Sequence, residues 1–371
     1  MDAMTNMVMM LFVVMIVPIL GIMLALTPYL MRRGEVFAVT VPTAEQRDPY
    51  VRRLKRNYAL IVALATVVFT VGGIACVGAN SPGAVMVIML MGTFVLTAGG
   101  YGLMLFYRVK MNAYKREQHW VADVQESVAV VSEGPVPKAI SLKWNLLYLP
   151  LMVITFAVGA VGYGSMPDMI PMHVGFDGAV NNWTEKTPLV LLMPILIQGF
   201  MAACFVFSHW TITRSKKWAE PGAPATSALA YGMFARAQST YLVVGGLAIT
   251  AAMIAMPLSF MNVLTLNQAG VLIVIAALVL CVGAIVVSVV YGQAGSRVFK
   301  RMQGSDLLLS DDDEHWKLGI FYCNPNDPSL FLPERFGVGW TMNWARPAVW
   351  IILAVFVLVT VGFMGAIMLL F

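Results

Sequence analysis

The stretch AGVLIVIAALVLCVGAIVVSVVYGQ, residues 269–293, contains no charged side chain. It exceeds the roughly 20 apolar residues that an α-helix needs to cross the hydrocarbon core of a bilayer. Seven other runs also have at least about 20 residues and no charged side chain, and the sequence therefore predicts eight transmembrane helices. The eight runs are residues 6–31, 57–79, 84–107, 145–164, 188–210, 239–261, 269–293 and 347–371.

The composition agrees with a polytopic membrane protein. Hydrophobic residues make up 59% of the chain, charged residues 12%, and the mean hydropathy is +0.79. These values exclude an ordinary soluble domain. The net charge of +5 does not indicate nucleic-acid binding, because the basic residues are divided among the loops and do not form one basic face.

The distribution of Lys and Arg predicts the orientation. Of 24 such residues, all except Lys186 fall in four segments, which are 32–56, 108–143, 214–236 and 297–346. Cytoplasmic loops retain Lys and Arg, so these segments should face the cytoplasm, where anionic lipid headgroups would be their partners. The expected fold class is an all-α polytopic membrane protein of eight helices, with both termini outside and a small β-hairpin element in the cytoplasm.

Several local patterns predict structure on the cytoplasmic side. Residues 37–42 alternate like a strand, and Asp48-Pro49 provides an N-cap followed by proline at the first helical position. The acidic run 311–314 is interpreted as solvated charge, with a cation site as the alternative. Residues 324–328 have the composition of a turn, and flanking strand-like pieces predict the β-hairpin element.

These patterns divide the chain into five parts. Residues 1–144 form an N-terminal three-helix region, 145–210 a helix-loop-helix, 211–293 helices six and seven, 294–346 a cytoplasmic aromatic-rich module, and 347–371 helix eight.

The only sizeable external loop is residues 165–187, which carries a net charge of −2 with His neutral. Asp177-Gly178 predicts a turn within it, and Trp183 has the amphipathic shape favoured at a membrane interface. The candidate ligand-recognition residues of this loop are Asp168, His173, Asp177, Trp183 and Lys186.

Two segments resemble known families. Pro167-Asp168, Ile170-Pro-Met-His173, Gly178, Trp183 and Lys186 resemble the loop motif of bacterial membrane proteins related to SdpI, the immunity protein against a sporulation-delay toxin. That family has Asn shortly after the His, whereas this chain has Gly175 or Asp177. Residues 316–347, including Phe321-Tyr322-Cys-Asn324-Pro, resemble an uncharacterised module often fused to the first. The resemblance implies an immunity or envelope-stress protein of the bacterial cytoplasmic membrane.

The chemistry of the loop leaves three interpretations open. His173 with Asp177 and other carboxylates could bind a divalent metal weakly, although a single His among oxygen ligands is not a zinc spacing. The loop could instead recognise a peptide or a lipid headgroup, or it could be a structural cap. No cofactor is expected, and metal binding is not the favoured interpretation.

The spans argue against two classes of function. Ionisable groups within a membrane mark ion pathways and proton relays, and the eight runs contain no Asp, Glu, Lys or Arg. Coupled transport and intramembrane aspartyl proteolysis are therefore disfavoured. A Ser/His protease is not indicated either. Its two catalytic side chains must meet, whereas Ser208 and His209 are sequence neighbours that point in different directions on a helix. Gln198 is expected to form an interhelical hydrogen bond.

The leading hypothesis follows from the resemblance. It is a protein that recognises a membrane-active peptide or a lipid headgroup through the 165–187 loop and signals to a soluble transcriptional regulator. The alternatives are a membrane enzyme acting on lipid or cell-wall precursors, metal-assisted at the same loop, and a passive lipid or peptide exporter. Enzymatic activity is the less favoured expectation.

Overall fold

A computed structural model describes residues 3–32, 34–42, 44–120, 136–175, 179–217, 223–302 and 311–370, without the side chains of residues 3–5, 7 and 8. Eight helical segments within these ranges are long and apolar enough to cross a membrane, which confirms the predicted fold class. The segments are Met9–Leu30, Pro49–Gly78, Pro82–Glu117, Leu142–Ser165, Pro188–Arg214, Pro224–Phe260, Leu266–Met302 and Pro347–Leu370.

The spans are built from α-helices with short 3-10 and π segments. The elements that form them are α1 (Ala3–Leu30), α2 (Pro49–Gly78), α3 (Pro82–Phe94), the π-helical η2 (Val95–Gly99), α4 (Gly100–Glu117), η3 (Leu142–Leu147), α5 (Tyr148–Gly162), η4 (Tyr163–Ser165), η5 (Pro188–Leu191), α6 (Leu192–Arg214), α7 (Pro224–Ala252), α8 (Ala255–Phe260), α9 (Leu266–Tyr291), η6 (Gln293–Gly295), α10 (Ser296–Met302) and α11 (Pro347–Leu370).

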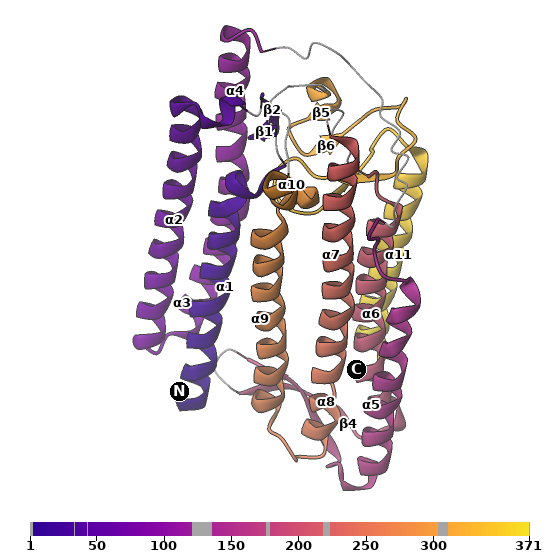
Figure 1. Ribbon diagram of the computed structural model, residues 1–371. Helices are drawn as coiled ribbons and strands as arrows, with labels where there is room; N and C mark the ends of the chain where they lie inside the picture. The colour runs from indigo at the N-terminus through magenta and orange to yellow at the C-terminus, as the bar shows by residue number, and fades with distance from the viewer. Residues whose placement is uncertain are drawn as a thin grey trace.

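The helices form two groups that meet along α1. The first group is α1 to α4, and the second contains α5 to α9 (Figure 1). α1 packs along α2 and also contacts α9, so it joins the two groups. α11 lies at the edge of the second group beside α6, and Val349 is its one buried residue among those described.

Local sequence signals set several helix ends. Oδ1 of Asp48 accepts hydrogen bonds from the backbone N–H groups of Tyr50 and Val51, and Pro49 occupies the first helical position, as predicted. A turn of three residues separates α2 from α3. Before α9, Thr265 and Gln268 form a capping box.

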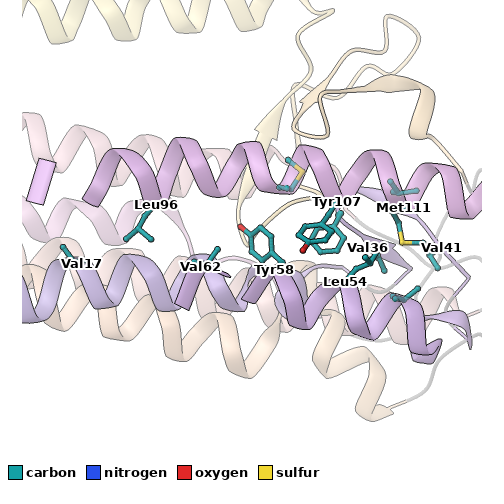
Figure 2. Packing of buried hydrophobic residues seen from close by; sticks show 13 residues of the cluster. Val17, Val36, Val41, Leu54, Tyr58, Val62, Leu96, Tyr107 and Met111 are labelled. Atoms are coloured by element: carbon teal, nitrogen blue, oxygen red, sulfur yellow. The ribbon is translucent and has the colours of Figure 1, made fainter. Parts of the chain in front are cut away.

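The segment between α1 and α2 is called the first inner loop, because the Lys and Arg distribution predicts that this end of the bundle faces the cytoplasm. The largest buried apolar cluster lies where α2 and α4 meet this loop (Figure 2). Phe37 stacks on Tyr107 with ring centroids 5.2 Å apart and meets Tyr58 edge-on at 5.7 Å. Val36 and Val41 are also fully buried there. The inner loop is therefore part of the core of the first helix group.

Within the described residues, four antiparallel two-stranded sheets lie at the two ends of the bundle. On the inner end, β1 (Glu35–Val36) pairs with β2 (Val39–Thr40), β5 (Trp316–Lys317) pairs with β6 (Phe321–Tyr322), and β7 (Phe331–Pro333) pairs with β8 (Trp340–Met342). On the outer end, β3 (Met169–Val174) pairs with β4 (Val180–Glu185). The predicted inner β-hairpin element is thus confirmed.

Two details of the inner end differ from the sequence prediction. Residues 37–42 are not one strand, because Phe37 and Ala38 adopt positive φ values of 50° and 58° and form the turn between β1 and β2. The turn at residues 324–328 does not close a hairpin either. It connects β6 to β7, and each of these strands pairs with a different partner.

Candidate functional site

The external loop is a β-hairpin that packs on the outer ends of the helices. Met169 faces Glu185, Pro171 faces Trp183, and the register shifts on either side of His173. Ile170 is fully buried among Met166, Val190 and Phe260. The hairpin is therefore anchored by its apolar side, and its other side faces outward.

His173 is fixed by a side chain that the sequence did not single out. Its Nδ1 lies 2.6 Å from Oδ1 of Asn181, on the opposite strand. An amide oxygen only accepts hydrogen bonds, so the proton belongs on Nδ1, and Nε2 of the neutral ring remains an acceptor. The sequence does contain a signal for this contact. Asp177-Gly178 between two alternating segments predicts a hairpin, and a hairpin brings His173 and Asn181 to facing strands.

Lys186 secures the hairpin to the preceding helix. Its Nζ donates to the backbone oxygen of Met166 at 2.7 Å and lies 5.1 Å from the ring centroid of Tyr163. Its backbone N–H donates to the carbonyl of Asp168 at 2.8 Å. A cation near the last carbonyls of a helix is favourable, so this ammonium group is already engaged within the protein.

The hairpin separates the sequence-predicted residues into two groups. Asp168 and Lys186 lie at its base, whereas His173 lies toward its tip, roughly 16 Å away along the strand at about 3.3 Å per residue. Trp183 is 49% exposed and lies between these positions. Asp177 lies outside the described residues. Among the residues that are described, no group of three His, Cys, Asp or Glu side chains could hold a metal ion.

A cavity of about 360 Å³ lies beside the tip-proximal half of the hairpin. His173 and its strand neighbours form one wall, α1 contributes Met9 and Phe12, and α9 contributes most of the remaining lining, including Asn267. The lining is apolar apart from His173 and Asn267. The arrangement can accept an apolar group at the junction of the two helix groups and offers it two polar partners, His173 and Asn267.

Two helices that meet this hairpin end on the inner module formed by residues 311–346. α6 follows β4 through η5, and at its inner end the backbone N–H of Lys216 donates to the carbonyl of Phe331 at 2.8 Å. Nζ of Lys216 donates to Asp327 at 2.7 Å. α9 contacts β3, and the Gln293 amide beyond its inner end donates to the carbonyls of Glu334 and Gly339.

The module is also held by a cluster of buried and half-buried charges, which the sequence did not predict. The first three residues of the acidic run 311–314 form ion pairs, so the interpretation of the run as solvated charge is wrong for them. Asp312 and Asp313 both accept from the Arg335 guanidinium, and Asp311 and Asp313 accept from Lys115. We call Glu35, Arg108, Lys115, Asp311, Asp312, Asp313 and Arg335 the inner charge cluster.

The inner charge cluster joins three distant parts of the chain. Asp313 accepts from the backbone N–H and the hydroxyl of Thr40, at 3.0 and 2.6 Å, and so ties the module to the first inner loop. Arg108 of α4 donates to the carbonyls of Ala38 and Trp316. The turn at Ala38, which has an unfavourable positive φ, is therefore held by hydrogen bonds from outside the loop.

Burial and pairing shift the pKa values of the acidic groups in different directions. Burial raises the pKa of Glu35, although Arg32 and Arg335 oppose it. Burial would also raise the pKa of Asp313, but Arg335 and Lys115 outweigh this and hold it well below its usual range. For Glu334, burial acts without a cationic partner and raises the pKa to about 7.

The polar residues inside the spans have structural partners. Gln198 of α6 donates to Oγ1 of Thr155 on α5 at 2.7 Å and to the carbonyl of Thr250 on α7 at 2.9 Å, which confirms the predicted interhelical role. His209 is fully buried, and its two ring nitrogens contact Asn145 and the carbonyl of Ile140.

Two segments of the chain match known protein families. Residues 150–197 match Domain of unknown function (DUF1648), which is found in SdpI-like membrane proteins, and residues 325–350 match Family of unknown function (DUF5808). No curated protein and no solved structure matches the chain. The first match contains the whole β3–β4 hairpin, and the second contains Arg335 and the β7–β8 hairpin. This multi-pass membrane protein therefore carries a DUF1648 domain at the end of the bundle that holds the β3–β4 hairpin and a DUF5808 segment at the opposite end.

Proposed function

We propose that this protein is an SdpI-like immunity or envelope-stress protein of the bacterial cytoplasmic membrane. Its outer hairpin recognises a membrane-active peptide, and its inner module reports occupancy to a soluble regulator. The observation that carries this proposal is the cavity beside His173, because it combines an apolar lining with the polar side chains of His173 and Asn267. An amphipathic peptide at the membrane surface presents the complementary combination.

The orientation of His173 supports this function. Because Asn181 accepts from Nδ1, the Nε2 atom of the neutral ring can accept a hydrogen bond from a ligand. The side chain is exposed and also lines the cavity. A ligand whose apolar part enters the cavity therefore has a polar partner beside it.

The reporting role is supported by the continuity of the helices. α6 follows the hairpin through η5 and α9 contacts β3, and residues just beyond the inner ends of these helices, Lys216 and Gln293, bond to the inner module. A ligand that displaces the hairpin relative to these helices acts on elements that end at the module. Packed helices transmit such displacements because they have discrete arrangements.

Susceptibility of a deletion strain tests the recognition role. The strain is complemented with the wild type, with His173→Ala/Trp183→Ala, or with the control Thr187→Ala/Val263→Ala, whose residues are exposed on the outer face and do not line the cavity. A panel of cationic membrane-active peptides is then applied at equal expression. We expect at least one peptide to kill the first variant at a lower concentration than the wild type and the control. Equal susceptibility of all strains, including the uncomplemented deletion, would rule out the proposed function.

A further inference from the structure

Two lysines from different helices lie near the inner end of α1, and no carboxylate of the described residues forms an ion pair with either. Lys55 belongs to α2, which packs along α1, and Lys300 belongs to α10, which Arg297 joins to the backbone of Tyr29 at the inner end of α1. Neither side chain forms an ion pair with any residue in the described part of the chain. Juxtaposed like charges are unfavourable unless an anion lies between them.

The packing of α2 against α1 fixes the depth of Lys55. Gly21 of α1 lies against Thr66, and Val13 lies against Gly73, so the two helices are antiparallel in this register. Lys55 is 11 residues before Thr66 and lies on the same face of α2. This register places Lys55 level with the inner end of α1, where the headgroup region begins.

α10 holds Lys300 at the same level. Val298 and Phe299 of α10 are buried against α7, and Arg297 donates to the carbonyl of Val289 at 2.7 Å and to that of Tyr29 at 3.4 Å. Arg297 therefore ties α10 to the inner ends of α9 and α1. Lys300 is three residues further on and shares the side of the helix that carries Arg297.

α1 has an exposed apolar face that ends at Tyr29, to whose carbonyl Arg297 donates. Val14, Ile22 and Tyr29 are spaced by eight and seven residues, share one face of the helix, and are 41%, 48% and 44% exposed. α2 and α9 flank α1. The two cations thus lie at headgroup depth, next to a surface that faces the hydrocarbon core. An anionic phospholipid has the complementary arrangement, with a negatively charged phosphate above apolar acyl chains.

We propose that Lys55 and Lys300 bind the phosphate of an anionic phospholipid, whose acyl chains lie along the exposed face of α1. The site bridges the first helix group and α10, so an occupied site stabilises the junction between the two helix groups. Arg32 does not compete for the phosphate, because Glu35 accepts from its guanidinium at 2.6 Å. The site is independent of the outer hairpin, and the proposed function can fail without affecting it.

The thermal stability of the full-length protein in a neutral detergent tests this site. Phosphatidylglycerol, phosphatidylcholine or inorganic phosphate is added, and the unfolding midpoint is followed by tryptophan fluorescence. A ligand that binds only the folded state raises the midpoint. We expect phosphatidylglycerol to raise it by several degrees in the wild type and to have less than about half that effect on Lys55→Gln/Lys300→Gln.

Two further variants separate site binding from general charge effects. Lys138→Gln/Lys143→Gln removes the same charge from exposed positions elsewhere on the inner side and should keep the full shift. Lys55→Arg/Lys300→Arg retains both cations and should also keep most of it. The proposal is overturned if Lys55→Gln/Lys300→Gln responds like the wild type, or if phosphatidylcholine or inorganic phosphate gives an equal shift. If the glutamine variant does not fold, loss of the shift in the arginine variant overturns it instead.

Discussion

Nε of Arg335 lies 3.3 Å from Oε1 of Glu35, and both side chains are only 1% exposed. The two residues belong to the first inner loop and to the inner module, at opposite ends of the sequence. Asp312 and Asp313 complete the neutralisation of this guanidinium. Since a buried charge is tolerated only with partners, docking of the module and ordering of the loop depend on each other.

Replacing Arg335 by Met should destabilise the protein by about 3–5 kcal/mol, because three carboxylates lose a buried partner. Unfolding in detergent and SDS mixtures, followed by tryptophan fluorescence, measures this loss. Arg116→Met at an exposed position is the control and should change stability by less than about 0.5 kcal/mol. Adding Glu35→Gln to Arg335→Met should recover part of the loss. A similar effect of the two Arg→Met changes would contradict the structural role of the pair.

The inner module should show a pH dependence that originates in Glu334. Its pKa is raised from 4.5 to about 7 in the folded protein, so the folded state holds a proton that the unfolded state has released. The associated stability is present below pH 4.5 and is lost as the pH rises through 7. The loss amounts to at most about 3 kcal/mol, at 1.36 kcal/mol per pKa unit.

Chemical unfolding of the wild type and Glu334→Gln at pH 5, 6, 7 and 8 tests this dependence. Glu35 also has a raised pKa and titrates in both proteins, so the difference between them isolates Glu334. Asp327 has a pKa of about 2 and stays ionised throughout. The two curves should converge at pH 5, and the wild type should fall below the variant at pH 8. Parallel curves would mean that Glu334 does not titrate in this range.

Glycine substitutions should separate close helix packing from open helix surface. A Cβ atom at Gly246 of α7 would lie 2.3 Å from the hydroxyl oxygen of Tyr148, which is buried between α5 and α7. Gly246→Ala should therefore cost about 1–3 kcal/mol through overpacking. A Cβ atom at Gly270 of α9 meets nothing within 4 Å, so Gly270→Ala should be neutral or stabilise by up to about 1 kcal/mol. Equal effects in a thermal unfolding assay would show that α5 and α7 do not pack this closely.

Sequence patterns predict the spans and helix starts because each depends on local chemistry. A charge-free run of 20 or more residues has few alternatives to a membrane helix, and Asp48-Pro49 begins α2 through bonds to the next two residues. The inner charge cluster has no such local signature. Glu35 and Arg335 look like ordinary surface charges in the sequence, and only the docking of the module buries them.

The outer hairpin could be predicted from the sequence only in part. Its turn has a sequence signal in Asp177-Gly178, but the contact of His173 with Asn181 depends on a register that shifts at His173 itself. The pairing of hairpins on the inner side was similarly hidden, because strands of two or three residues carry little periodicity. Pairing in such short strands follows from packing, which the local pattern does not encode.

Gln293 should control the docking of the inner module to α9. The side chain is fully buried, and its amide donates to the carbonyls of Glu334 and Gly339 at 2.8 and 2.7 Å while its oxygen accepts from the Gly339 N–H at 2.9 Å. Gln293→Leu removes all three bonds and leaves buried backbone groups unsatisfied, each at a cost of about 1–3 kcal/mol. The lost bonds lie between the module and η6, so the helices within the membrane should remain folded.

Hydrogen exchange measured by mass spectrometry distinguishes local release of the module from global unfolding. In Gln293→Leu, amides of β7 and β8 should exchange at least ten times faster than in the wild type, since 1.4 kcal/mol corresponds to a factor of ten in the opening equilibrium. Amides of α6 and α7 should keep their protection. Gln118→Leu, at the exposed end of α4, serves as the control and should leave both regions unchanged. Acceleration in every helix would mean that Gln293 supports the whole bundle. No acceleration would mean that the inner charge cluster and the contacts of Lys216 hold the module without Gln293, and α9 would then be unable to report the state of the outer hairpin through Gln293.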